Sequence, residues 1–448
     1  MFKRKPSAEP PKIEIPDKNK SVTIIRSYRV ITPLMGGGVR TNQNDLSFLI
    51  RPTSIRGQLR FWWRACFGGS ANLDTDTLPD ETAQQRWLLE QMFERESAIF
   101  GQAAYYSEDS SEPKKVIGKG ASAIQIEVNV TNKGKTIQYP HHKKGLIPIY
   151  DIDSPYSYAA FPLKDAHDPL INIEFTLTIR LNYADQRGEL EKVLWAWQTF
   201  GGIGARTRRG FGVLQRIDSQ VDHYAFTNKA QLERQIKEII GNRSYWPNDV
   251  PHLSAKMQLR LLNLTQDPLK IWADLLKRYK EFRQQRNESD QPNRPGRSRW
   301  PEPDALRRLT RQRSRMHERP VSELDAFPRG EFGLPIMFHF KDSDDPVDSE
   351  LRLQASSDLK QQKGDRFASP MLLKPVASNG QLFGLIAVLE GSTLNGRQPI
   401  IKNRRITAAA VTIEVSENQA RTIVDNHRHP ILTTSGVITS FLATIEEE

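Results

Sequence analysis

Two arginine-rich segments in the first half of the sequence carry residue types that can hold a sugar-phosphate backbone. In SIRGQLRFWWRACF, residues 54–67, Arg56, Arg60 and Arg64 recur at every fourth position and would lie on one side of a helix. In GGIGARTRRGFG, residues 201–212, five glycines stand among three arginines. Glycine lets backbone N–H groups come close to a phosphate, and the planar guanidinium group binds phosphate oxygens. The two segments together predict an electropositive surface for RNA backbone.

Both segments also have a plainer structural interpretation. The helical arginines could pair with acidic residues on a solvated face, and the glycines could serve only to turn the chain tightly onto an edge strand. The glycine segment lacks the G-K-[ST] ending of a P-loop, and it follows a predicted helix, unlike a dinucleotide-binding fingerprint. Nucleotide hydrolysis is therefore not expected there.

Further residues are candidates for the same RNA-binding surface. Trp63 and Trp300 stand among arginines and offer indole rings on which bases could stack. Arg366 and Lys374 flank an apolar run and would add positive charge to a groove. The full set of candidate RNA-binding residues is Gly36, Gly37, Gly38, Arg51, Arg56, Arg60, Trp63, Arg64, Gly202, Gly204, Arg206, Arg208, Arg209, Arg299, Trp300, Arg366 and Lys374.

Catalytic and metal chemistry have weaker support in the sequence. Asp45 lies in a predicted loop just before the arginine-rich helix, where a carboxylate could activate a ribose 2′-hydroxyl, although a loop aspartate more often caps a turn. His141 and His142 fall in a polar loop, and no H-E-x-x-H spacing occurs. The single cysteine, Cys66, rules out a cysteine-rich zinc site. We expect no cofactor or metal, and Asp45 is only a weak catalytic candidate.

The composition favours a polyanionic partner and a reducing compartment. The 448 residues carry a formal net charge of +11, which favours nucleic acid over an acidic small substrate. A lone cysteine is typical of cytosolic proteins. Residues 1–20 are basic and rich in proline, without the apolar run of a signal peptide, and no apolar run reaches the length of about 18 residues that a membrane span needs. We expect a cytoplasmic protein with no membrane partner and a flexible arm at residues 1–20.

The hydrophobic periodicity predicts an α+β fold with two domains, residues 21–245 and 246–448. In the first, the order is strand, helix, strand, strand, helix, strand, with a further helix at 81–100 inserted between core elements. This order is that of a ferredoxin-like (RRM-like) domain. The second domain is less clear and is predicted to be a distant copy of the same fold. The predicted elements are strands at 22–31, 124–130, 171–181, 255–264, 332–340, 381–390 and 406–415, a final first-domain strand within 201–217, helices at 52–67, 189–200 and 269–286, and a loop at 287–303.

Five stretches of the sequence resemble the RAMP superfamily of CRISPR proteins. They are ITPLMGGG, IRPTSIRGQLRFWWRA, GGIGARTRRGFG, SRWPEPDAL and RFASPMLLKP, which together span residues 31–375. The glycine segment and the P-x-S-x-R-G helix start resemble the superfamily in general. The other motifs resemble more narrowly the first RAMP subunit of the type III-B (Cmr) effector complex.

The resemblance implies two ferredoxin-like domains and a place at the head of a helical complex built on guide RNA. It implies partners of two kinds, CRISPR guide or target RNA and other RAMP subunits, and a non-catalytic role in antiviral defence. Two alternatives remain open. One is a RAMP-type endoribonuclease, because the backbone-cutting relatives are similar in having an aspartate about where Asp45 stands. The other is a protein scaffold within the complex.

Overall fold

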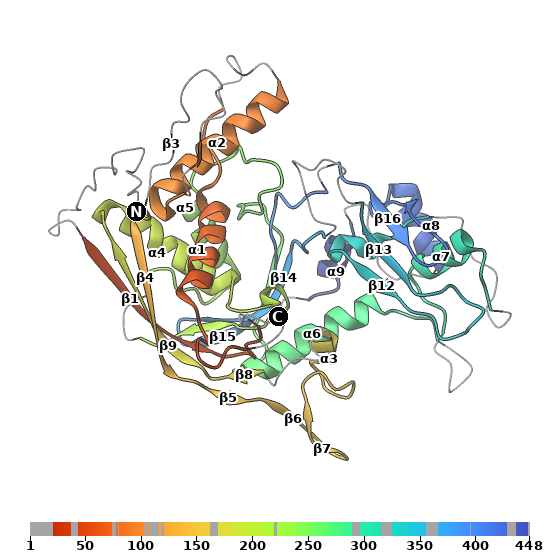
Figure 1. Ribbon diagram of the computed structural model, residues 1–448. Helices are drawn as coiled ribbons and strands as arrows, with labels where there is room; N and C mark the ends of the chain where they lie inside the picture. The colour runs from red at the N-terminus through yellow and green to blue at the C-terminus, as the bar shows by residue number, and fades with distance from the viewer. Residues whose placement is uncertain are drawn as a thin grey trace, which may run out of the picture.

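Four antiparallel strands form the sheet of the first half, in the order β10-β1-β9-β4 (Figure 1). They are β1 (Val22–Val30), β4 (Ile124–Asn132), β9 (Glu174–Leu181) and β10 (Leu214–Arg216). Along β1 and β9 apolar residues alternate with polar ones, so one face is buried against helices α1 (Pro52–Phe67) and α4 (Arg187–Phe200). The order of strands and helices expected from the sequence is therefore present in this half, with α2 (Glu81–Phe100) as the inserted helix.

The computed structural model describes residues 21–36, 44–73, 78, 80–102, 105–106, 116–117, 121–161, 169–218, 222–288, 296–314, 325–354, 366–394, 396–427 and 436–446. The arm expected at 1–20 lies outside them. The remaining elements of the first half are β2 (Tyr105–Tyr106), β3 (Val116–Ile117), β5 (Lys135–Thr136), β6 (Gln138–His141), β7 (Gly145–Pro148), α3 (Ser157–Ala160), β8 (Leu170–Ile171), η3 (Ala184–Gln186), η4 (Thr207–Arg209) and α5 (Lys229–Ile240).

The described strands of the second half form two separate sheets. One has the order β11-β15-β14 and the other β12-β13-β16-β17. The predicted α+β class is confirmed, but a second ferredoxin-like domain is not. The elements are β11 (Leu259–Leu262), α6 (Pro268–Arg283), α7 (Glu302–Thr310), η5 (Pro328–Phe332), β12 (Ile336–Phe338), β13 (Ser349–Leu353), β14 (Met371–Ser378), β15 (Gln381–Val388), β16 (Pro399–Lys402), β17 (Ala409–Ala410), α8 (Glu417–His427) and α9 (Val437–Ala443). No helix in the described part of the chain is long and apolar enough to cross a membrane.

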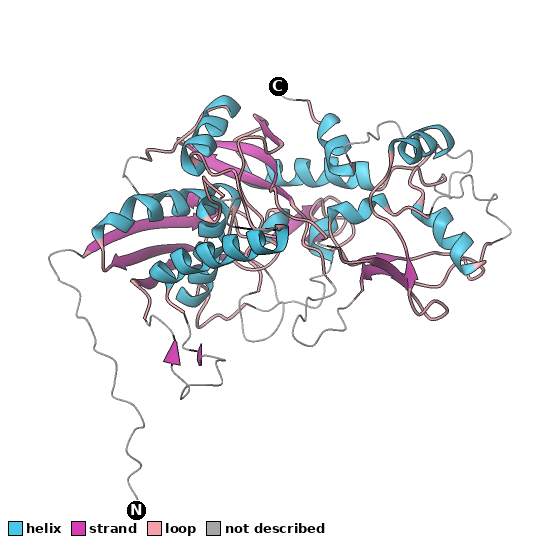
Figure 2. Ribbon diagram, turned by 90° about the horizontal axis from the view of Figure 1, so that it is seen from above, coloured by secondary structure: helices cyan, strands magenta, loops and turns pink. Residues whose placement is uncertain are grey.

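The hydrophobic core is continuous between the two halves. Its largest cluster joins Ile24 and Trp197 of the first half to Leu259, Leu372 and Leu385 of the second. Helix α6 runs from this shared region towards the sheet of β12, β13 and β16 (Figure 1). Figure 2 shows the helices and strands of the molecule from above. The domain boundary at residue 245 stays a prediction, and the two halves share one packed interior.

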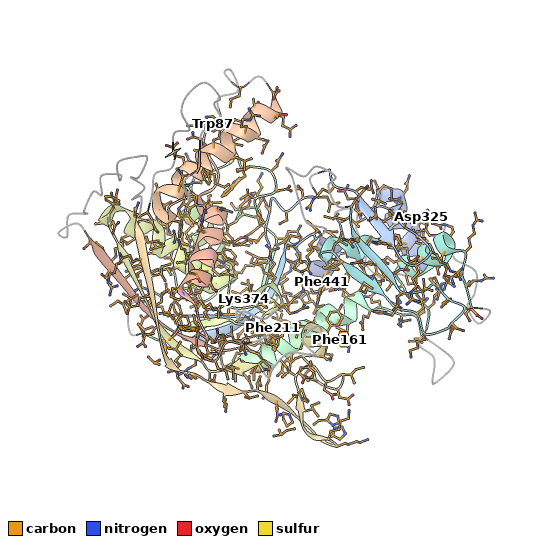
Figure 3. All side chains as sticks on the ribbon, in the orientation of Figure 1. Trp87, Phe161, Phe211, Asp325, Lys374 and Phe441 are labelled. Atoms are coloured by element: carbon orange, nitrogen blue, oxygen red, sulfur yellow. The ribbon has the colours of Figure 1, made fainter. Side chains whose placement is uncertain are left out.

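Strand β14 lies at the junction of the halves and contains a buried lysine. All eight residues of β14 are buried, and the strand contacts α4, β10 and η4. The ammonium group of Lys374 donates hydrogen bonds to the carbonyl oxygens of Gln198 (3.0 Å) and Gly201 (2.7 Å) at the end of α4. Lys374 is labelled at the centre of the molecule in Figure 3. Its expected place on an RNA-binding surface is wrong for this structure, because its side chain is fully enclosed.

A buried carboxylate fixes α2 onto α1. Glu96 of α2 is fully buried and accepts hydrogen bonds from Arg60 Nε (2.5 Å), Arg64 Nε (2.8 Å) and Arg64 Nη2 (2.9 Å). The guanidinium group of Arg56 turns to the same helix and donates to the carbonyl oxygen of Phe100. The arginine side of α1 is thus the surface on which α2 packs.

Replacing Lys374 with methionine should make stability less dependent on pH. Burial lowers the pKa of Lys374 to about 7, whereas an unfolded lysine has a pKa of about 10.4. Between these values the unfolded chain binds the extra proton, so the free energy of unfolding of the wild type rises with pH by up to about 1.4 kcal/mol per pH unit relative to Lys374→Met. Urea unfolding of both proteins at pH 7 and pH 9 measures this difference. The prediction is contradicted if the wild type and Lys374→Met differ in free energy of unfolding by the same amount at pH 7 and at pH 9.

Replacing Glu96 with glutamine should destabilise the fold. The change leaves two guanidinium groups without their shared anion, and each side chain is partly exposed (31% for Arg60, 40% for Arg64), so water offsets part of the loss. We expect the free energy of unfolding to fall by about 1 to 3 kcal/mol. Glu90→Gln, at an exposed position of the same helix, is the matched control and should shift it by less than about 0.5 kcal/mol. Equal unfolding midpoints for the two variants would show that the ion pairs of Glu96 with Arg60 and Arg64 contribute nothing to stability.

Candidate nucleic-acid interface

The glycine loop (residues 201–212) lies beside the segment that contains Gly36 and beside α1. The amide of Ala205 donates to the carbonyl oxygen of Met35 (2.7 Å). The guanidinium carbon of Arg208 lies 5.8 Å from the ring centre of Phe61 on α1. The structure therefore brings together the two segments that the sequence analysis proposed as one surface. Gly37 and Gly38 lie outside the described residues.

The glycines of this loop are required by its own packing. Gly204 has φ +82°, and a Cβ there would stand 2.6 Å from the carbonyl oxygen of Met35. Gly212 has φ +61°, and its Cβ would stand 1.8 Å from the carbonyl oxygen of Ile203. Gly202 is itself buried. The plainer interpretation, a bend that only glycine allows, accounts for these positions.

Two of the three loop arginines bind backbone carbonyl groups of the second half. Arg209 donates to the carbonyl oxygens of Met371 (3.0 Å) and Phe332 (3.1 Å) and to the hydroxyl of Tyr279 (3.0 Å). Arg208 donates to the carbonyl oxygen of Ser369. Burial, and next to it the charge of Arg209, lowers the pKa of Arg208 to about 10. Neither cation has a carboxylate partner among the described residues, so both keep their charge uncompensated.

The arginines of α1 do not line this surface as expected. Arg60 and Arg64 are held by Glu96, and Arg56 by the end of α2. The expectation of a track of free guanidinium groups along α1 is therefore wrong for Arg60 and Arg64, because a buried carboxylate on a neighbouring helix shares its charge between them. The solvated-face alternative named a similar pairing, but the acid is buried and comes from α2.

Asp45 and Arg51 neutralise each other at the start of α1. Asp45 Oδ2 accepts from Arg51 Nη2 (2.7 Å), and Oδ1 accepts from the amides of Ser47 (3.0 Å) and Phe48 (3.2 Å). The Arg51 hydrogen bond is the main cause that lowers the pKa of Asp45. Asp45 thus has the geometry of a turn-capping residue, and its carboxylate is a weak base.

The two tryptophans cannot act as stacking platforms in this structure. Trp63 is 1% exposed and donates from Nε1 to Glu189 (2.8 Å). Trp300 is 1% exposed and donates to the carbonyl oxygen of Phe282 (3.2 Å). The stacking role expected of both is wrong, since each ring packs in the core. Of the other second-half candidates, Arg299 donates to Asn287 (3.0 Å), and Arg366 is exposed.

One side of the first two turns of α1 is open to solvent. No side chain caps the first turn and no acidic residue lies in it, so the helix dipole leaves positive potential there. Ser54 and Gly57 are exposed, and a Cβ at Gly57 would meet nothing within 4 Å. Phe61 follows Gly57 by one turn and lies on the same side of the helix. This uncharged face of α1 borders Arg208 at Phe61.

The open face of the first-half sheet lacks the aromatic residues of an RNA-reading sheet. The outward positions of β9 are Glu174, Thr176, Thr178 and Arg180, and those of β1 include Ser27. RRM domains read bases on aromatic residues at such positions. The described strands therefore favour backbone contacts near the glycine loop. The described residues contain no cluster of three or more His, Cys, Asp or Glu that could hold a metal ion.

Comparison with known proteins identifies the first half. Residues 27–215 match the family model of the RAMP superfamily. The chain is similar to the apo structure of Cmr1 from Pyrococcus furiosus, with 16% identity, a TM-score of 0.44 and coverage of 83% of this chain and 89% of that one. It is similar to a chain of type III-B Cmr-beta bound to cognate target RNA and AMPPnP, with 16% identity, a TM-score of 0.41 and coverage of 83% and 95%. No curated protein sequence matches.

The family match covers the sheet, α1 and the glycine loop, which are the elements that build the candidate interface. Over residues 27–215, which are less than half of the chain, the sequence is thus similar to the RAMP superfamily.

Proposed function

We propose that this protein is a non-catalytic RNA-binding subunit of a type III-B CRISPR ribonucleoprotein, and that it holds guide or target RNA by its backbone. One observation carries the proposal. Beside Phe61 of α1, Arg208 and Arg209 of the glycine loop have no carboxylate partner among the described residues. Uncompensated guanidinium groups favour binding of phosphate. The match of residues 27–215 to the RAMP superfamily and the motif resemblance to type III-B subunits support the choice of complex.

The contacts favour binding that is independent of base sequence. The basic surface consists of backbone dipole and guanidinium groups, which recognise phosphates and carry no sequence information. The buried positions of Trp63 and Trp300 remove the two rings that the sequence offered for base stacking. We therefore propose that base pairing between RNA strands provides the sequence specificity, and that this chain holds the RNA backbone in place.

A charge placed at Gly57 tests this surface without disturbing the fold. Glutamate there should weaken binding of single-stranded RNA about fivefold at low salt, since two like charges about 4 Å apart in water repel by ~1 kcal/mol. Gly57→Gln is the matched control of equal size and should bind like the wild type. Both changes should leave the helix as stable or more stable, because glycine is a poor helix former. Fluorescence anisotropy with two unrelated RNA sequences provides the measurement, and equal affinities of the two variants would place RNA elsewhere.

The competing function is a metal-independent endoribonuclease that uses Asp45. The ion pair with Arg51 and the lowered pKa of Asp45 argue against a general base at this position. We expect labelled guide-repeat RNA to remain intact when incubated with the purified chain, and Asp45→Asn to leave this result unchanged. Cleavage by the wild type that is lost in Asp45→Asn would establish the enzyme instead.

A further inference from the structure

A cavity of about 330 Å³ lies where the glycine loop meets the second half of the chain. Arginines contribute much of its lining: Arg206 and Arg209 come from the glycine loop, Arg283 from α6 and Arg329 from η5. Tyr158 of α3 and Tyr279 of α6 also line it, and no aspartate or glutamate does. Four cations from three segments of the chain therefore face one small space.

The described acids near the cavity compensate only a part of this charge. Arg329 pairs with the buried carboxylate of Glu302, at 3.0 Å from Nε. Arg209 is satisfied by carbonyl and hydroxyl oxygens. Arg283 lies over aromatic rings, 5.3 Å from the centre of Tyr279, and its buried Nε has no hydrogen-bond partner among the described atoms. Three of the four guanidinium groups thus have no described ion pair.

Arg206 is the least satisfied of the four. Its backbone is left-handed, with φ +58°, and its buried Nε has no hydrogen-bond partner among the described atoms. Burial first, and then the charge of Arg209, lowers the pKa of Arg206. A cation that is partly withdrawn from water and repelled by its neighbours is costly for the fold. An anion in the cavity would remove this cost.

We propose that this arginine cavity binds one phosphate group of the RNA strand, which the guanidinium groups of Arg206 and Arg283 hold and which the charge of Arg209 attracts. The inference rests on the proposed function and deepens it. Guanidinium groups bind phosphate through paired N–H donors. The volume is at the lower end of that of small-ligand sites, roughly 300 to 1,000 Å³, which suits a phosphate with part of its nucleotide.

The glycine loop links the cavity to the proposed RNA surface. Arg206, which lines the cavity, lies two residues before Arg208, which borders Phe61 of α1. A strand that follows the glycine loop from Phe61 would therefore reach the cavity at Arg206. The phosphate could be internal to the strand or at one of its ends, and both sources share the chemistry recognised here.

The test compares three RNAs of one sequence: a circular RNA, a linear RNA with a 5′-phosphate, and a linear RNA with a 3′-phosphate. Binding of each is measured with the full-length chain and with Arg206→Gln. Arg421→Gln on α8 makes the same change in net charge at an exposed site and is the control. We expect Arg206→Gln to weaken binding about tenfold, the loss of one charge-assisted contact, and to unfold at the same or a higher temperature than the wild type.

Met337 provides a second pair of variants that does not remove an arginine. It lines the cavity and is 51% exposed, so Met337→Glu should fold and place a carboxylate where the phosphate would lie. Met337→Gln, which has nearly the same size and no charge, is its control. We expect Met337→Glu to bind RNA more weakly than the wild type, and Met337→Gln to bind it equally well.

The outcomes separate the two proposals. Weaker binding of all three RNAs would support an internal phosphate, and weaker binding of one linear RNA alone would support the phosphate at that end. If the wild type binds RNA and both Arg206→Gln and Met337→Glu bind equally well, the arginine cavity is not a phosphate site, while the proposed function stands. If the wild type binds none of the three RNAs, the proposed function itself fails.

Discussion

The structure depends on how buried cations are accommodated where its two halves meet. Lys374, Arg208 and Arg209 all lie at this junction, and all donate to backbone carbonyl oxygens. Carbonyl groups satisfy the N–H donors of a cation but do not cancel its charge. The halves are thereby joined through hydrogen bonds that leave a positive potential at the junction, and β14 supplies the acceptors Ser369 and Met371 at or just before its first residue.

On α1, in contrast, arginine side chains pair with a carboxylate. There, Glu96 of α2 is buried between Arg60 and Arg64. Its carboxylate neutralises much of the positive charge of that face and fixes α2 onto α1. Asp45 likewise engages Arg51. The molecule therefore divides its arginines into a neutralised group, which fixes helix packing, and an uncompensated group around the glycine loop. Only the second group is suited to a polyanion, since its members have no internal counter-ion to displace.

This division also bears on the choice between a binding protein and an enzyme. A general base needs a carboxylate or imidazole whose pKa lies near the working pH. Asp45 is shifted the other way by its arginine, and the described part of the chain has no cluster of acids and histidines fit for a metal. The uncompensated guanidinium groups around the glycine loop suit the proposed binding of RNA backbone.

The sequence by itself determined the element order of the first half, because alternation in β1 and β9 and the 3.6-residue rhythm of α1 and α4 are local patterns. It also indicated the glycine loop and the resemblance to the RAMP superfamily, whose family model matches residues 27–215. It missed β14, whose residues are buried on both faces and so show no alternation. Which arginines keep their charge was decided only by tertiary structure, since the partners of Arg60 and Arg209 lie 36 and 162 residues away in the chain. The arginine cavity, likewise, exists only because folding brings the glycine loop, α6 and η5 together.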